Sequence, residues 1–241
     1  MSRARRGMLA AMLSAPGKAG GASLADRAYD AIKKAIIQCR LRPGARVSEA
    51  QLTEMTNHGK AAVRAALQRL SHDGLVVAVP RQGYMISTVT AQDVVDLFDV
   101  RLLLEPAAAR LATGRVDQQQ LRELDRLCHI GYHPDDPDSV ERFQRVNSEF
   151  HLLIAEAAGN PRLTRFLATV LEEMHRLYYL GLTLASPDDP VHEQGHRDLV
   201  EALASDDADR AEQVARDGVV EAKRNSVDAL LTLPSMRSAE L

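Results

Sequence analysis

The chain has 241 residues, of which 45% are hydrophobic and 26% are charged, a composition typical of a globular protein with enough material for two domains. Its two cysteines are too few for a disulfide framework and favour a reducing, cytoplasmic location. No apolar run approaches the roughly 18 residues that a membrane-spanning helix needs. The composition therefore excludes disulfide-rich secreted proteins, and we expect no membrane partner.

The net charge of −3 conceals an asymmetry along the chain. Residues 1–90 carry 14 Lys and Arg against 5 Asp and Glu, whereas residues 91–241 carry 16 against 28. The first segment has a formal charge of +9 and the second a formal charge of −12. A basic segment joined to an acidic one predicts that only the first binds a polyanion.

Two amphipathic helices are predicted near the start of the basic segment. Apolar residues at helical spacing predict the first over residues 24–39, and a Pro-Gly pair terminates it. Ser48 and Gln51, three residues apart, predict a capping box that begins the second helix. Leu52 and Met55 are expected to supply the apolar side of that helix.

A third helix is predicted from about Lys60 to Ser71. Lys60, Arg64 and Gln68 are spaced by four, so they share one face, which carries no carboxylate. Apolar residues at the 3, 4 and 7 spacing of a buried helical face are Val63, Ala66, Leu67 and Leu70. Lys and Arg can bond guanine or phosphate, and Gln can pair with adenine. The pattern favours a helix that enters the major groove of DNA, although a solvated charged helix has the same pattern.

Two strands are predicted after the third helix, over residues 75–79 and 84–89. The turn between them carries Arg81 and Gln82 at its tip, and Gly83 allows the backbone to approach a neighbouring segment closely. Such a wing would add contacts to phosphates or to the minor groove of DNA. The alternative is an ordinary surface hairpin.

Short motifs in this basic segment follow the order known from one family. They are Leu41–Gly44, Val47–Glu49, Val63–Leu70, Asp73–Val76 and Gln82–Tyr84. With them, residues 24–88 resemble the winged helix-turn-helix domain of GntR-type bacterial transcription regulators. The resemblance implies DNA contact by the start of the third helix, which includes Lys60 and Ala61, by Arg64, and by the wing glycine, Gly83.

The chain departs from the family at the start of the third helix. The family usually has Ser-Arg-Thr-Pro where this chain has Gly59–Ala62. Lys60 keeps the positive charge but lacks the planar fork of arginine, which binds guanine through two hydrogen bonds. Ala50 occupies a position of the second helix that often carries arginine. We therefore expect an altered operator sequence or weaker binding, rather than loss of DNA binding.

The acidic segment has the pattern of long helices from Thr90, which is expected to cap the first of them. Pro106 is expected at a kink or break. The remaining helices are predicted at about 118–128, 139–158, 161–183, 191–204 and 208–231. Overall, the sequence predicts a mainly α protein. Its parts are a disordered tail (1–22), a winged helix-turn-helix domain (23–89), a bundle of six or seven helices (90–232) and a C-terminal tail (233–241).

Several segments of the bundle also follow a known pattern. They are Asp99–Arg101, Leu104–Pro106, Phe150–His151, Ala155–Pro161 and His196. With them, residues 92–230 resemble the FCD effector domain of FadR-type GntR regulators. The resemblance implies a pocket that senses a small organic acid, beside a divalent metal held by one Asp and three His. Here the corresponding positions hold Asn147, His151, His196 and, approximately, Gly218.

This ligand set is depleted for zinc or nickel. An amide oxygen is a weaker ligand than a carboxylate, and glycine has no side chain to coordinate. His192 is either a substitute ligand or a solvated loop residue. His151 and His196 are alternatively a polar pair that faces the pocket without metal, and Gly218 leaves space that enlarges the cavity. We expect little bound metal after purification of the protein.

Arg101 has two candidate roles. Its guanidinium can bind the carboxylate of an acidic effector, or it can form an ion pair with Glu105, four residues further along the helix. Arg176, Tyr178 and Tyr179 are also expected near the cavity. The two tyrosines are adjacent in the sequence, so at most one of them can point inward from the helix.

These features predict a homodimeric regulator of transcription with two further partners, an operator in double-stranded DNA and a small effector. Two alternatives remain. A metal-dependent enzyme would use His151 and His196, but the sequence has no nucleophile elbow, P-loop, GxGxxG or HExxH motif. A non-specific nucleic-acid-binding protein would respond to no small molecule.

Overall fold

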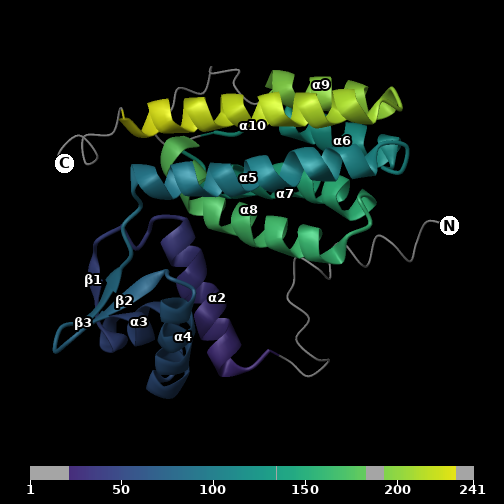
Figure 1. The fold of residues 1–241 in the computed structure, drawn as a ribbon. Coiled ribbons are helices and arrows are strands. Elements are labelled where there is room, and N and C mark those ends of the chain that lie inside the picture. Colours follow the sequence, from purple (N-terminus) through teal and green to yellow (C-terminus); the bar gives the residue numbers. More distant parts are fainter. Residues whose placement is uncertain (1–21, 134, 183–192, 232–241) are drawn as a thin grey trace. The chain divides into compact units, whose positions relative to one another are not determined.

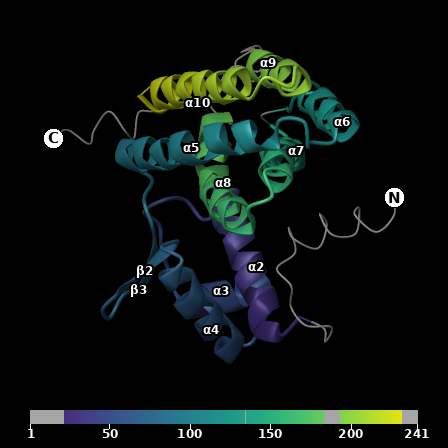
Figure 2. The ribbon, with the colours of Figure 1, turned by 45° about the vertical axis from the view of Figure 1, so that its right-hand side comes forward.

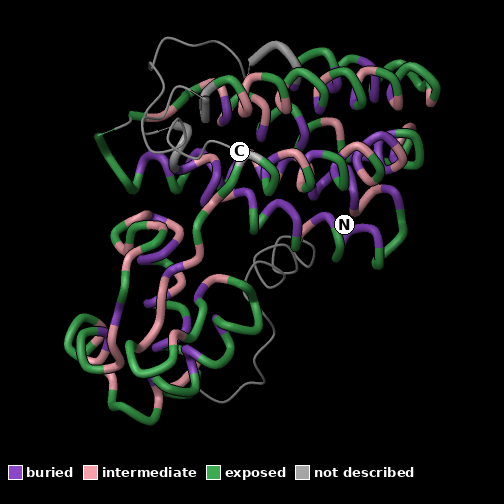
Figure 3. Tube along the Cα trace, turned by 60° about the vertical axis from the view of Figure 1, so that its left-hand side comes forward, coloured by how far each residue is buried: buried purple, intermediate pink, exposed green. Residues whose placement is uncertain are grey.

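The computed structural model describes residues 22–133, 135–182 and 193–231 (Figure 1). Contacts divide the chain into two compact units. Of the described residues, the first unit contains residues 22–36 together with Leu41–Ser87, and the second contains Ile37–Arg40 together with those from Thr88 onward. Each unit encloses buried residues of its own (Figure 3). The predicted mainly α fold class is confirmed.

Over residues 22–87, the first unit consists of three helices and a small antiparallel sheet (Figures 1 and 2). The helices are α2 (Leu24–Ile37), α3 (Glu49–Thr56) and α4 (Lys60–His72). The strands are β1 (Arg46–Val47), β2 (Val76–Val79) and β3 (Gly83–Ile86), in the order β1-β3-β2. The hairpin of β2 and β3 confirms the predicted wing. Strand β1 was not predicted, because two residues are too short to show the alternation that marks a strand.

Local sequence signals explain the bounds of α3. The capping box is present: the Ser48 hydroxyl accepts a hydrogen bond from the Gln51 N–H at 3.2 Å, and the Gln51 side chain accepts one from the Ser48 N–H at 2.9 Å. Asn57, with φ of 54°, ends the helix in the left-handed conformation that asparagine tolerates. Leu52 is buried as expected, but Met55 is 47% exposed, so its assignment to the apolar side was wrong.

The core of the first unit confirms the periodicity of α4. All four predicted apolar residues of that helix are at most 1% exposed, and they pack with Ile32 and Ile36 of α2 and with Ile86 of β3. The Tyr29 hydroxyl donates a hydrogen bond to Asp73 at 2.6 Å and so joins α2 to the end of α4. These contacts hold the opposite face of α4 toward solvent.

The second unit is a helical bundle. In its described residues the helices are α5 (Ala91–Ala112), α6 (Gln118–Cys128), α7 (Pro137–Ala157), α8 (Pro161–Leu182), α9 (Glu193–Ala204) and α10 (Ala208–Leu231). Helix α5 lies between α10 and α8 (Figures 1 and 2). The predicted cap at Thr90 is confirmed by a second capping box with Asp93. Within the described residues, no helix combines the length and the apolarity needed to cross a bilayer.

Of the two alternatives expected at Pro106, the break is wrong, because α5 continues through it as a helix of 22 residues, and the kink stays a prediction. A proline inside a helix removes one backbone hydrogen bond and crowds the preceding turn. Here the adjoining residues Glu105, Ala108 and Ala109 are all buried. Packing of these residues against the bundle favours the continuous helix despite the missing hydrogen bond.

Candidate functional site

The predicted DNA-binding face of α4 is exposed. Lys60, Ala61, Arg64 and Gln68 all face solvent, on the side of the helix opposite to its buried residues. The exposure was a condition of the prediction, since a buried Lys60–Gln68 face would have refuted it. Contact of these residues with DNA remains a prediction.

Arg64 is held by a carboxylate that the sequence pattern did not assign to the site. Glu49, the first residue of α3, accepts hydrogen bonds from Arg64 Nε at 3.0 Å and from Arg64 Nη2 at 2.8 Å. The hydrogen bonds raise the pKa of Arg64 and lower the pKa of Glu49. The pair spans the two helices of the helix-turn-helix and orients the guanidinium. The only indication of this ion pair in the sequence was Glu49, the acidic residue in the first turn of α3.

The wing glycine is required by a close backbone approach. Gly83 has φ of 92°, and a Cβ built on it would lie 2.7 Å from the backbone oxygen of Val47 on β1. Arg81, at the exposed turn, also has a positive φ of 63°. The side chain of Gln82 accepts a hydrogen bond from Arg46, an exposed residue of β1. Arg46 is thus a further cation beside the wing, and it was missed because β1 was not predicted.

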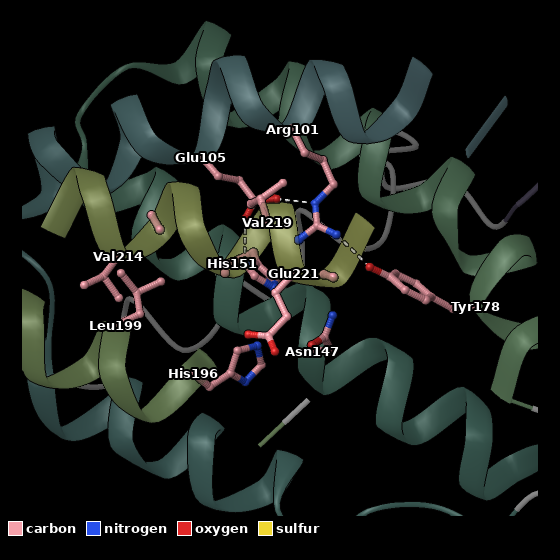
Figure 4. Close-up of a pocket in the computed structure, with 13 residues that line it drawn as sticks. Arg101, Glu105, Asn147, His151, Tyr178, His196, Leu199, Val214, Val219 and Glu221 are labelled. Atoms are coloured by element: carbon pink, nitrogen blue, oxygen red, sulfur yellow. Dashed lines mark hydrogen bonds and ion pairs between the residues drawn. The ribbon is translucent and has the colours of Figure 1, made fainter. Parts of the chain in front are cut away.

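A small pocket lies within the second unit (Figure 4). It has a volume of about 50 Å³, room for only a few water-sized groups. Helices α5, α7, α8, α9 and α10 all contribute to its lining. The polar groups that converge on it are Arg101, Glu105, Asn147, His151, Tyr178, His196 and Glu221.

A continuous polar network crosses this pocket (Figure 4). Arg101 is paired with Glu105, and it donates a hydrogen bond to the Tyr178 hydroxyl at 2.6 Å. Nδ1 of His151 lies 3.0 Å from the other carboxylate oxygen of Glu105. Burial alone would raise the pKa of Glu105, but Arg101 and His151 bring that pKa well below its usual range. Of the two roles open to Arg101, the structure therefore shows the ion pair with Glu105.

The two predicted histidines face each other across the pocket. Their ring centroids are 5.3 Å apart with an interplanar angle of 74°, and His196 also stacks on Phe150 at 4.0 Å. Asn147 lines the same space. A Cβ built on Gly218 would meet no atom within 4 Å, so the predicted extra space is present. His192 lies outside the described residues.

This arrangement does not fit the metal site that the family implies. Within the described residues, no group of three His, Cys, Asp or Glu side chains is placed to hold a metal ion. Glu105, the carboxylate nearest to His151, is already engaged by Arg101. Asn147 offers only a neutral amide, and Gly218 offers no ligand. We therefore derive no metal chemistry for the pocket.

Arg176 is not among the residues that line the pocket, so its expected place there was wrong. It is buried elsewhere in the second unit, near Cys39 and Asp93, and burial lowers the pKa of its guanidinium. The physical reason is its position on α8, two residues before Tyr178. Residues two apart on a helix point in different directions. Tyr178 lines the pocket and Tyr179 does not, as expected for neighbours on one helix.

Both units match known families. Residues 24–86 match the model described as "Bacterial regulatory proteins, gntR family", and residues 96–219 match the FCD domain. YdhC of Bacillus subtilis, an uncharacterized HTH-type transcriptional regulator, is 30% identical over 162 residues, which cover 64% of this chain and 70% of the relative. The transcriptional repressor RspR of Escherichia coli is 23% identical, over 77% of this chain and 81% of the relative.

Solved structures agree on the fold. McbR/YncC of E. coli superposes with a TM-score of 0.68 at 22% identity, over 83% of this chain and 95% of that one. A putative GntR regulator from Rhodococcus sp. RHA1 superposes with a TM-score of 0.66 at 21% identity, over 87% of this chain and 98% of that one. With an exposed recognition helix beside a wing, and a separate helical unit around a polar pocket, the chain belongs to the GntR family of transcription regulators and carries an FCD effector domain.

Proposed function

We propose that α4 enters the major groove of an operator, where Lys60, Ala61, Arg64 and Gln68 face the bases and phosphates. The exposed face of α4, which carries no carboxylate of its own, is the observation that carries this proposal. Lys60 and Arg64 can bond guanine or phosphate, and Gln68 can pair with adenine.

The wing is proposed to contact the flanking phosphates or the minor groove through Arg81, Gln82 and Gly83. Arg81 and Gln82 are exposed at the turn between β2 and β3, and Arg46 lies beside Gln82. Contacts of this kind fix the position of a protein on DNA, whereas the contacts of the recognition helix select the sequence.

The effector of the helical unit is proposed to be a small organic acid that binds around Arg101, Asn147, His151 and His196. Within the described residues, Glu105, Tyr178 and Met174 contact only the Nε and Nη1 atoms of Arg101. We expect Nη2 to receive the carboxylate of the effector, while the amide and the imidazoles hydrogen-bond its remaining oxygens. The small volume restricts the effector to a few non-hydrogen atoms unless the helices move apart.

The protein is further proposed to act in the cytoplasm as a homodimer and to have no enzymatic activity. A single helix-turn-helix reads few base pairs, so two copies on a palindrome are needed for affinity and specificity. The effector would alter operator binding by favouring one arrangement of the two DNA-binding units. The absence of enzymatic activity is supported by the family and by relatives that are named as transcriptional regulators.

One experiment tests these proposals together. The full-length protein selects bound duplexes from a random DNA pool, and the selection is repeated with a panel of small mono- and dicarboxylic acids. We expect enrichment of a palindrome, and a change in retention of that palindrome with one acid of the panel. Failure to enrich any sequence would refute the operator, and an operator that no acid affects would refute the effector class.

A further inference from the structure

An apolar stripe follows the solvent-facing side of α5. Leu103 is 75% exposed, Leu111 is 44% exposed and Val100 is 39% exposed. Spacings of three and eight residues place these side chains on one side of the helix, with Ala107 between them. The side of α5 that faces the core carries other residues, among them Val94, Phe98 and Ala112, all completely buried. The side chains of the stripe therefore do not belong to the core of the second unit.

Two opposite charges flank this stripe at equal distances. Asp96 lies seven residues before Leu103, and Arg110 lies seven residues after it. Seven residues return a helix to within about 20° of the same direction, so the three residues form a line along α5. The sequence of groups along this line is acid, apolar residue, base. At about 1.5 Å per residue, the two charges are roughly 21 Å apart.

This pattern is complementary to a second copy of itself. If two α5 helices pack antiparallel across a two-fold axis at Leu103, Asp96 of one copy faces Arg110 of the other, twice. A parallel arrangement would instead place like charges together. Val100 would face the region of Pro106 and Ala107 in the partner, so that apolar groups meet between the two charged ends. The charges would add little to affinity at an exposed rim, but they would select the register.

The neighbouring helix widens the same surface. Arg110 contacts Asp209 and Glu212 of α10, and Lys223 of α10 contacts Asp99 of α5. These ion pairs show that α10 runs antiparallel to α5 along one edge of the stripe. In that register, Val220, which is 51% exposed, falls opposite the region of Leu103. The apolar surface therefore extends from α5 onto α10.

We propose that this face of α5 and α10 is the dimerisation surface, and that its occupant is a second copy of the same chain, antiparallel and centred on Leu103. The inference rests on the homodimer of the proposed function and identifies the residues that form it. Burying Leu103 at the axis removes the most exposed large apolar side chain of the described residues from water.

The first test substitutes charge for the apolar centre. Leu103→Arg in the full-length protein should give a monomer by light scattering after gel filtration, with a dimer dissociation constant at least tenfold higher than that of the wild type. Ile130→Arg and Phe166→Arg are matched controls, because these side chains are 70% and 55% exposed in the same unit but lie off the stripe. Circular dichroism checks that each variant is folded.

The possible outcomes distinguish failure of the proposed surface from failure of the homodimer on which it rests. A wild-type protein that is monomeric at every concentration, with and without DNA, would refute the homodimer and the surface together. A dimeric wild type that survives Leu103→Arg, or that Phe166→Arg dissociates instead, would refute the surface alone.

Cross-linking tests the antiparallel register independently. Leu103→Cys should form a disulfide-linked dimer under mild oxidation, because the two copies of a residue on the axis are adjacent. Asp96→Cys and Arg110→Cys should cross-link when the two variants are mixed, and neither should cross-link with itself. The wild-type chain, which keeps Cys39 and Cys128, is the background control. Efficient self-cross-linking of both end variants would show a parallel arrangement and overturn the proposal.

Discussion

Replacing Glu105 by glutamine should destabilise the helical unit strongly, because it removes the charge partner of a buried arginine. The side chains of Arg101 and Glu105 are only 3% and 6% exposed. Breaking a buried ion pair by removing one partner costs about 3–5 kcal/mol, since the other charge stays buried without compensation. At about 3 °C per kcal/mol for a unit of this size, the midpoint of thermal unfolding should fall by roughly 10 °C.

The effect of Glu105→Gln should also depend on pH. The pKa of Glu105 in the folded protein lies below its ordinary value of 4.5, so its contribution to stability is fully present above that pH and is lost as the pH falls. Below pH 4.5 the wild type should lose about 1.4 kcal/mol of this contribution per pH unit. The gap in unfolding free energy between wild type and variant should therefore narrow from pH 6 to pH 3.

Urea denaturation followed by circular dichroism measures these differences, with two controls. Glu123→Gln removes an exposed partner of Arg126 and should leave the unfolding midpoint unchanged. The double variant Arg101→Met with Glu105→Leu replaces both charges by apolar groups and should recover most of the stability. A Glu105→Gln variant within about 1 kcal/mol of wild type at pH 7 would show that Arg101 does not depend on Glu105 for its charge compensation.

Three further predictions concern the DNA-binding unit and the metal. Arg64→Ala should weaken operator binding and reduce the slope of log K against log salt by about 1 if the arginine contacts phosphate; unchanged affinity would contradict the placement of α4. Gly83→Ala should cost about 2–5 kcal/mol, because its φ is 92° and a Cβ would lie 2.7 Å from the Val47 oxygen, and an unaltered melting temperature would contradict this close approach. Elemental analysis after purification without chelator should find little zinc or nickel, whereas one equivalent would show that His151 and His196 hold a metal ion together with some other ligand.

Local signals in the sequence determined much of this protein. The capping box at Ser48, the cap at Thr90 and the exposed face of α4 were all predictable. These features depend on residues three to seven positions apart, whose relative directions a helix sets by itself. For the same reason the periodicity of α4 identified its buried face before any tertiary contact was known.

Only the tertiary structure showed which side chains from distant parts of the chain interact with each other. The sequence left Arg101 undecided between an effector and Glu105, and packing of α7 and α8 against α5 added His151 and Tyr178 to that pair. Arg176 is turned away from the pocket by its position on α8. Such choices depend on which helices meet and at what distance, and the period of a helix shows which side is buried but not what packs against it.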